Sequence, residues 1–368
     1  MGCDHIPFPV SVPTRTPLSA TFELTVRCNL KCKMCLFRHA DCENAALQAG
    51  ELTAAEWIDL ARQAAEAGTF NLLVTGGEPM LRPDFCEIWK GIYRYGFVTT
   101  LYTNATLITP QVMETLRKFP PHRIGVTIYG ASPETYDRVC GNGAAFDRAM
   151  EGIEQLMTLP SRMEYRTTII KDNFDDFHAL HCLVKERFGC DRLTHTRLVT
   201  QSVRGACADV NTCRLDPEDN IKLAYLHTID LIREVVGDAY DPRRVGIERK
   251  VQAKDNVMKP RLTIFGCDAG MNQYTISHDG KLLGCQMLGL FHTDARRSGL
   301  MRAWEDFPKT VKLPEVNEKC KKCENAHLCN TCFASRYAET GDLGGRPEYV
   351  CKDVETVKKL LDMGGISE

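Results

Sequence analysis

Three absences narrow the kinds of protein that this sequence can encode. It lacks any apolar run approaching the ~20 residues of a membrane-spanning helix, and its first residues lack the charged-then-apolar order of a signal peptide. It also lacks an excess of one charge, since 46 Lys and Arg residues face 48 Asp and Glu residues across 368 positions. We therefore expect a cytoplasmic protein that binds neither nucleic acid nor membrane and acts on small or peptidic substrates.

Cysteine is abundant instead, with 18 residues, and three of them lie close together. The stretch "RCNLKCKMCLF" places Cys28, Cys32 and Cys35 with three and then two residues between them. In a reducing compartment such spacing indicates metal binding rather than disulfides. A closed zinc site needs four ligands, whereas an iron-sulfur cluster of the 4Fe-4S type can be held by three thiolates with one iron left open.

Strand-like and helix-like segments alternate over the first half of the chain. Thr53, Thr109 and Ser132 each fit the N-cap of a helix, the last two followed by proline at the first helical position. About six strand-helix units predict an α/β fold with a parallel sheet, an open TIM-like partial (β/α)6 barrel rather than a closed one with eight units. Functional residues should then lie on the loops that follow the strands. The expected strands lie within 21–26, 70–75, 96–104, 123–130, 163–170 and 192–199.

The cysteine loop follows the first expected strand, and "GGEP" at 76–79 follows the second. Together these motifs resemble the radical S-adenosylmethionine (radical SAM) superfamily; a partial zinc site or an ordinary turn would explain only one of them. The resemblance implies that Cys28, Cys32 and Cys35 hold a 4Fe-4S cluster whose open iron is chelated by S-adenosylmethionine (SAM). It also implies an enzyme in which the cluster reductively cleaves SAM and the 5'-deoxyadenosyl radical abstracts a hydrogen atom from the substrate.

The same resemblance suggests which residues contact SAM. Gly76, Gly77 and Glu78 would meet the methionine amino group, because glycines let the backbone approach a ligand and a carboxylate can fix an ammonium group. Four further positions match less specifically, and they are Met34, Asn104, Thr127 and Arg166. Met34 carries a thioether where an aromatic residue is common. The Thr127 side chain is explained equally well as an ordinary strand hydroxyl, and the Arg166 side chain as part of a salt bridge at the barrel rim.

Cysteines dominate the spacing again beyond residue 260. "CDAGMNQYTISHDGKLLGC" carries Cys267 and Cys285 on either side of a hairpin turn expected at Asp279 and Gly280. "CKKCENAHLCNTC" then supplies four cysteines. This region resembles the SPASM extension of radical SAM enzymes that modify peptides, which implies two auxiliary 4Fe-4S clusters and three clusters in all. The implied outer ligands are Cys320, Cys323, Cys329 and Cys351, and the implied inner ligands are Cys267, Cys285 and Cys332.

Two features depart from the SPASM pattern. Two residues rather than three separate Cys329 from Cys332, and the inner cluster has three cysteines rather than four. Either a water, Asp268, Cys207 or Cys213 completes the inner cluster, or one of its irons is open. The alternative for the whole region is a pair of zinc ribbons, which "CKKC" and "CNTC" would also suit.

We expect four parts: an N-terminal extension 1–20, a radical SAM partial barrel 21–215, a helical bridging segment 216–260 and a SPASM domain 261–368. With about 20 residues before the first strand, a leader peptide would be recognised by a separate protein or by the barrel itself. Other cysteines and two histidines are expected to be packing or surface residues. They are Cys3, Cys42, Cys86, Cys140, Cys182, Cys190, His178 and His181.

The expected function is oxidation of a peptide or protein substrate, forming a thioether or another cross-link, because auxiliary clusters can accept an electron from a substrate radical. An uncapped iron of the inner cluster would bind a substrate thiolate. The expected electron donor is a flavodoxin or ferredoxin. The alternatives are sulfatase-maturase-like oxidation of Cys or Ser, a small-molecule dehydrogenase or epimerase, and a zinc-stabilised binding scaffold without catalysis.

The first prediction concerns the radical-generating cluster. Replacing Cys28, Cys32 and Cys35 together by Ala should abolish 5'-deoxyadenosine formation from SAM after dithionite reduction, because each residue supplies one of three protein ligands. The absorption of the auxiliary clusters should survive, and Cys42→Ala is the matched control. Normal 5'-deoxyadenosine production by the triple variant would contradict the assignment.

Overall fold

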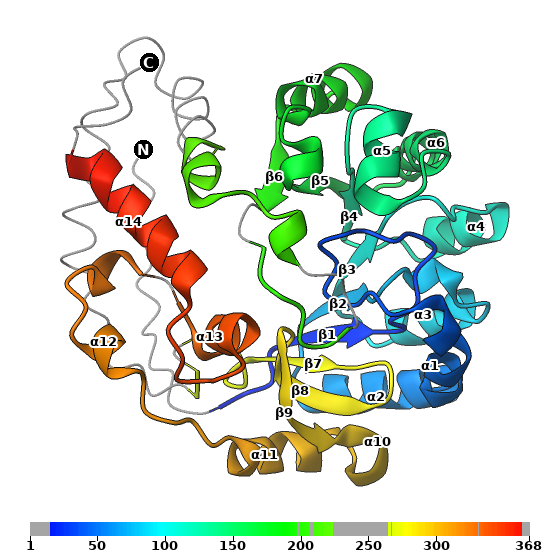
Figure 1. Cartoon of the computed structure of the whole chain (residues 1–368). Coiled ribbons are helices and arrows are strands. Elements are labelled where there is room, and N and C mark those ends of the chain that lie inside the picture. The colour runs from blue at the N-terminus through cyan, green and yellow to red at the C-terminus, as the bar shows by residue number, and fades with distance from the viewer. Residues whose placement is uncertain are drawn as a thin grey trace, which may run out of the picture.

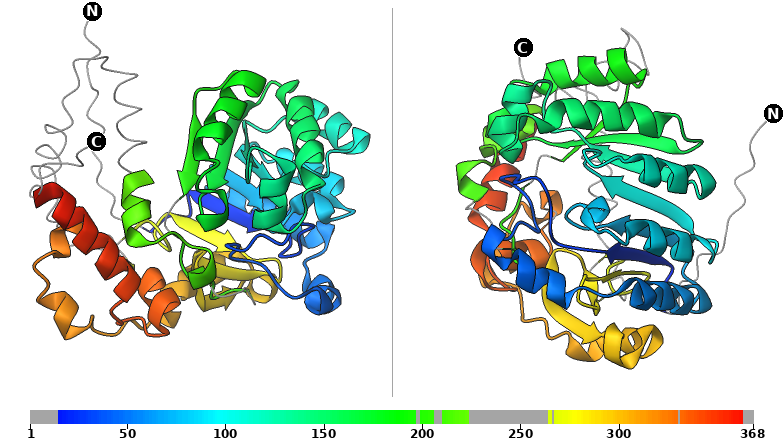
Figure 2. Two further views of the ribbon diagram at one scale, coloured as in Figure 1. Left: turned by 45° about the horizontal axis from the view of Figure 1, so that its top comes forward. Right: turned by 90° about the vertical axis from the view of Figure 1, so that its right-hand side faces the viewer.

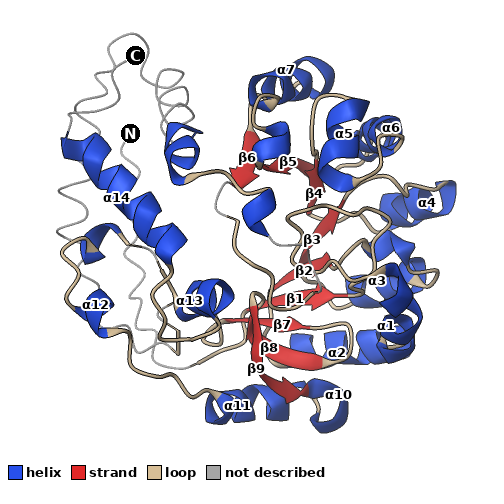
Figure 3. Ribbon diagram, in the orientation of Figure 1, coloured by secondary structure: helices blue, strands red, loops and turns tan. Residues whose placement is uncertain are grey.

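The structure is a computed structural model that describes residues 15–196, 199–205, 210–223, 264–265, 267–329 and 331–362. Its strands form one sheet of nine strands in the order β6-β5-β4-β3-β2-β1-β7-β8-β9 (Figure 3). The strands are β1 (Ser19–Glu23), β2 (Asn71–Thr75), β3 (Val98–Thr103), β4 (Arg123–Thr127), β5 (Arg162–Thr168), β6 (Leu193–Thr196), β7 (Gln273–Ile276), β8 (Lys281–Cys285) and β9 (Leu288–Asp294).

Helices α2 to α7 lie on one side of the sheet, and α12 to α14 lie on the other side of the molecule (Figures 1 and 2). The α-helices are α1 (Asn44–Gly50), α2 (Ala54–Glu66), α3 (Phe85–Tyr93), α4 (Pro110–Lys118), α5 (Pro133–Cys140), α6 (Ala145–Met157), α7 (Phe177–Phe188), α10 (Ala295–Ser298), α11 (Leu300–Thr310), α12 (Glu318–Lys321), α13 (Phe333–Thr340) and α14 (Glu348–Asp362). Short 3-10 helices span Asp41–Glu43, Pro79–Leu81, Lys171–Asn173, Val210–Thr212 and Ala326–Leu328.

The expected helix starts are confirmed. Thr53 caps α2 through a capping box, in which the Thr53 side chain accepts from the amide of Glu56 at 3.3 Å and the Glu56 carboxylate accepts from the amide of Thr53 at 2.7 Å. Thr109 and Ser132 cap α4 and α5, and proline follows each of them. These helix starts can be predicted from the sequence because each depends on residues within one helical turn.

The first six strands pair in parallel and do not close, which confirms the open α/β barrel. Each strand leads into a loop at the same edge of the sheet, so residues distant in sequence meet there. The Phe22 ring on β1 lies 5.0 Å from the Trp57 ring on α2, and neither side chain is exposed. This packing fixes the strand that delivers the cysteine loop.

The C-terminal region continues the barrel sheet, which the sequence did not indicate. β7 pairs in parallel with β1, and β8 and β9 extend the sheet as antiparallel strands. The turn between β7 and β8 is the expected hairpin, and Gly280 adopts a φ of 85° there. Phe307 of α11 lies fully buried against this hairpin, with its ring where a Cβ on Gly284 would stand.

Most of the bridging segment expected at 216–260 lies outside the described residues, as do Cys3 and Cys207. Among the helices that are described, none has the length and apolar character needed to cross a membrane.

Candidate functional site

The three clustered cysteines lie on the loop after β1, at the edge of the sheet where the parallel strands end. The backbone amide of Leu30 points to Cys28 Sγ at 3.4 Å, and the amide of Phe37 points to Cys35 Sγ at 3.4 Å. Cys35 lies close enough to interact electrostatically with both other thiols. Amide donors aimed at sulfur suit thiolates that hold an iron-sulfur cluster, so the donor set fits the expected group.

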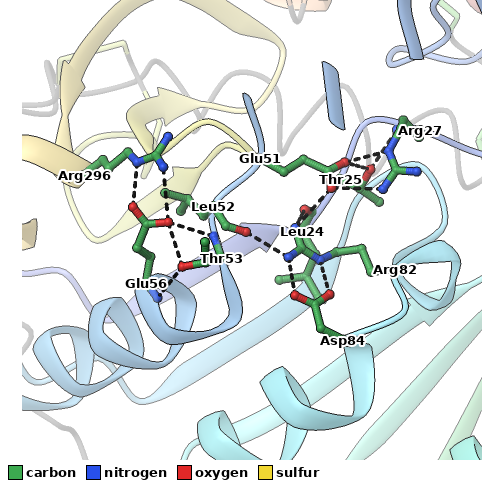
Figure 4. Close-up of polar contacts among 10 residues, drawn as sticks. All are labelled: Leu24, Thr25, Arg27, Glu51, Leu52, Thr53, Glu56, Arg82, Asp84 and Arg296. Atoms are coloured by element: carbon green, nitrogen blue, oxygen red, sulfur yellow. Dashed lines mark hydrogen bonds and ion pairs between the residues drawn. The ribbon is translucent and has the colours of Figure 1, made fainter. Parts of the chain in front are cut away.

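A buried ion network anchors the start of this loop (Figure 4). The Glu51 carboxylate accepts from Thr25 Oγ1, from Arg27 Nε at 2.9 Å and from Arg82 Nη1 at 3.3 Å. Arg82 also donates to the carbonyl oxygens of Leu24 at 3.0 Å and Leu52 at 2.8 Å. Because Arg27 directly precedes Cys28, the network fixes where the cysteine loop begins.

The loop after β2 packs against the same segment without room for side chains. A Cβ on Gly76 would stand 2.3 Å from the Thr25 carbonyl oxygen, and one on Gly77 would stand 2.3 Å from the Arg27 carbonyl oxygen. The amide of Gly77 donates to that Thr25 oxygen at 2.7 Å. The close approach of two backbone segments therefore requires glycine at both positions, whether or not a ligand also contacts them.

Glu78 lies fully buried between the second and third strands. Its carboxylate accepts from Thr103 Oγ1 at 2.9 Å and from the amides of Asn104 at 2.8 Å and Met80 at 3.1 Å. Burial raises the pKa of Glu78 to about 7, and these hydrogen bonds act in the opposite direction. The carboxylate therefore joins the loop after β2 to the end of β3.

Asn104 lies beside the first cysteine. Its Nδ2 is 3.7 Å from Cys28 Sγ and 3.0 Å from Asn29 Oδ1, and its own Oδ1 accepts from the amide of Thr106 at 3.0 Å. The next residue, Ala105, is the sole non-glycine residue of the described chain with positive φ, at 59°. Such strain concentrates at functional sites, and here it turns the chain directly after Asn104.

The structure places the remaining expected SAM contacts at the same edge of the sheet. Thr127 ends β4 and is paired in register with Arg166 on β5. The Arg166 guanidinium lies 4.3 Å from the centre of the Tyr102 ring and 3.4 Å from Glu164, and its side chain is 31% exposed. Met34 is buried within the hydrophobic core.

Sequence reasoning missed two neighbours of the cysteine loop. Cys140 and Tyr129 are both hydrogen-bond partners of the Cys32 side chain, although Cys140 ends α5 more than a hundred positions further along the chain. The amide of Lys31 also donates to the Cys140 carbonyl at 2.9 Å. No spacing in the sequence links Cys140 and Tyr129 to Cys32. The one signal that points to them is the alternation of strands and helices, which brings the loops after the strands together at one edge of the sheet.

The four expected outer ligands line one cavity of about 140 Å³, close to α12, α13 and α14. They come from two segments of the chain, 320–329 and α14, and they are Cys320, Cys323, Cys329 and Cys351. Four thiols that line one cavity are a suitable donor set for a 4Fe-4S cluster. Among the residues that the structure describes, no group of three or more His, Cys, Asp or Glu side chains is arranged to hold a single metal ion such as zinc. The sequence predicted this grouping, and the structure brings the four residues together.

The three expected inner ligands also lie near one another. Burial raises the pKa of Cys285, and the charges of Cys332 and Cys267 raise it further. Cys213, one proposed fourth ligand, is buried, and its Sγ lies 3.6 Å from the Val210 carbonyl oxygen. Cysteine is thus gathered at three places, on the loop after β1, around the β8 hairpin and beside α14.

Known sequences resemble most of this chain. The family profile of the Radical SAM superfamily matches residues 22–181. The AdoMet-dependent heme synthase of Methanosarcina barkeri (strain Fusaro / DSM 804) is 30% identical over 344 residues, covering 89% of this chain and 95% of that protein. This similarity includes the cysteine-rich C-terminal region as well as the barrel.

Two solved structures share the fold. Streptococcus suis SuiB superposes with a TM-score of 0.67 at 18% identity, over 92% of this chain and 77% of SuiB. The enzyme anSMEcpe with bound AdoMet superposes with a TM-score of 0.66 at 16% identity, over 95% of this chain and 99% of that protein. At these identities the likeness establishes the architecture.

The second prediction concerns Glu78. Because burial raises its pKa from the ordinary 4.5 to about 7, the folded protein keeps a proton in this window that the unfolded chain has lost. The free energy of unfolding of the cluster-free protein should therefore fall by about 3 kcal/mol as pH rises from 4.5 to 7. Urea denaturation of Glu78→Gln should show that slope removed, and the exposed control Glu114→Gln should retain it. An unchanged slope in Glu78→Gln would show that Glu78 does not titrate there.

Proposed function

Because the chain belongs to the radical SAM superfamily, we propose that Cys28, Cys32 and Cys35 hold a 4Fe-4S cluster and that SAM binds its open iron. When bound, this pair supplies a 5'-deoxyadenosyl radical that abstracts a hydrogen atom. The amides of Leu30 and Phe37 donate to ligand sulfurs and stabilise their negative charge.

The residues around SAM divide into two kinds in this proposal. Gly76 and Gly77 present backbone groups to the methionine portion of SAM. Arg166, which the resemblance also implies as a SAM contact, is assigned here to a substrate carboxylate instead, because its guanidinium is partly exposed at the open edge of the sheet. Glu78 and Asn104 act behind the two glycines, because their side chains already bond to the chain itself and to Cys28. Met34 and Thr127 complete the proposed SAM site.

We further propose that the C-terminal cysteines hold two auxiliary 4Fe-4S clusters and that the enzyme oxidises its substrate. The observation that carries this is the single cavity formed by Cys320, Cys323, Cys329 and Cys351. An iron-sulfur site beside a radical-generating barrel provides a place for the electron that a substrate radical loses. The inner site would use Cys267, Cys285 and Cys332. Its fourth ligand would be a water, Asp268, Cys207 or Cys213, or one of its irons would be open.

The substrate class that sequence similarity favours is a heme-type tetrapyrrole. The heme synthase of M. barkeri matches this chain across the barrel and the cysteine-rich region alike. Heme-type tetrapyrroles carry carboxylate side chains. The partly exposed guanidinium of Arg166, held over the Tyr102 ring at the open edge of the sheet, is suited to bind one of them.

The second candidate substrate is a peptide or protein. SuiB has been solved with its precursor peptide SuiA and anSMEcpe with the Cp18Cys peptide, and both share this fold. The three-cysteine inner site adds a specific reason, because an uncapped iron would bind a substrate thiolate and favour a thioether product.

The third prediction separates these substrates. Reconstituted enzyme with SAM and dithionite should form 5'-deoxyadenosine about tenfold faster when an iron porphyrin with propionate side chains is added, because bound substrate commits the radical to productive abstraction. Mass spectrometry should show an altered porphyrin, and Arg166→Gln should weaken the stimulation. Cysteine-containing peptides are the parallel arm. Stimulation by peptide without stimulation by porphyrin would replace the first candidate with the second.

The fourth prediction concerns cofactor content. Three clusters require about twelve iron atoms per chain, four per cluster, after anaerobic reconstitution. The double variant Cys320→Ala/Cys323→Ala should hold about eight, while the control Cys182→Ala/Cys190→Ala should match the unmodified chain. About four iron atoms together with bound zinc in the unmodified chain would support zinc ribbons instead.

A further inference from the structure

The cavity beside α14 has an unusual charge balance for a site lined by four thiols. Its charged lining residues are Lys319, Arg336, Arg346 and Glu355, so three cations face one carboxylate. A cluster with four thiolate ligands is an anion and becomes more negative by one charge when it takes up an electron. Positive side chains around it therefore favour its reduced form.

Arg336 is the most firmly held of these cations. It lies on α13 and is 9% exposed, with Nη1 at 3.3 Å from Cys320 Sγ and at 2.7 Å from the Gly345 carbonyl oxygen. Among the described residues, its guanidinium meets a sulfur and a carbonyl oxygen and no carboxylate. A buried guanidinium without a carboxylate is costly, which suggests that the group at the cavity supplies the compensating negative charge.

Arg346 lines the same cavity beside another of the four cysteines. Its guanidinium is hydrogen-bonded to the side chain of Cys351, and this contact raises the pKa of Arg346. Unlike Arg336, Arg346 is exposed to solvent, so its charge is screened by water and salt. The two arginines therefore contact ligands from different segments of the chain with different degrees of burial.

We propose that Arg336 donates a hydrogen bond to the Cys320 thiolate and would raise the reduction potential of a cluster held in this cavity, so that the cluster would accept an electron more readily. The inference rests on the proposed function in that a cluster must occupy the cavity. The cluster would be reduced by one electron that the substrate radical loses, and no covalent bond forms or breaks at the cluster. Arg346 contributes in the same direction and more weakly, because solvent screens it.

The test is a redox titration followed by electron paramagnetic resonance. In a background carrying Cys28→Ala, Cys32→Ala and Cys35→Ala, the outer signal is the one that Cys320→Ala/Cys323→Ala removes. Arg336→Met should lower the reduced-to-oxidised ratio of this signal at a fixed potential about tenfold, which equals a negative shift of about 59 mV for one electron. Arg336→Lys should shift the potential less, because it keeps the charge and loses the planar fork.

Two controls make the outcome decisive. Arg302→Met removes an exposed arginine on α11 that pairs with Asp306, and it should leave the potential unchanged. Arg346→Gln removes a cavity charge without disturbing the buried guanidinium, so it reports on the charge effect even if Arg336→Met lowers cluster occupancy. An unchanged potential in both Arg336→Met and Arg346→Gln, with iron content retained, would overturn the inference. An iron content that Cys320→Ala/Cys323→Ala does not reduce would instead overturn the outer cluster itself.

Discussion

The geometry of the site depends on how closely the loop after β2 approaches the end of β1. The amide of Gly77 donates to the Thr25 carbonyl at 2.7 Å, and the amide of Glu78 donates to the Arg27 carbonyl at 3.0 Å. No Cβ fits at Gly76 or at Gly77. Through this contact the loop proposed to bind SAM and the loop proposed to bind the cluster are one rigid unit. The buried Glu51 network and the strained turn after Asn104 then hold that unit in a single arrangement.

A second contact links this unit to the C-terminal cysteines. Arg204 pairs with the fully buried Glu23 on β1 at 2.9 Å, donates to the Gln286 carbonyl at 2.8 Å directly after Cys285, and lies 5.1 Å from the Phe37 ring on the cysteine loop. Together with the β1–β7 pairing, it places the cysteine loop after β1 and Cys285 at the end of β8 on one continuous sheet. Fixed separation between such sites is what stepwise electron transfer between them needs.

Much of the fold was predictable because its signals are local. Caps such as Thr53, the alternation of strands and helices, and the turn at Gly280 depend on neighbours in sequence. The outer cysteine grouping was predictable from resemblance. The pairing of β7 with β1, the contact of Cys140 with Cys32, and the burial of Arg336 at Cys320 were not predictable, because each joins segments whose sequences carry no mark of their partner. Glu78 shows the same limit: the ligand contact that its motif suggested stays a prediction, and the bonds of its carboxylate to Thr103 and Asn104 were not indicated by the sequence.

The other proposals depend on one property of the site, namely that Cys28, Cys32 and Cys35 leave one iron of their cluster open for SAM. The direct measurement is electron-nuclear double resonance on the reduced protein with SAM labelled by ¹⁵N in the amino group and by ¹⁷O in the carboxylate. Hyperfine coupling of both labels to the cluster is expected, and it should disappear when Cys28, Cys32 and Cys35 are replaced together by Ala. A reduced cluster on the intact loop that shows no coupling to either label, with SAM present in excess, would contradict an open iron that binds SAM.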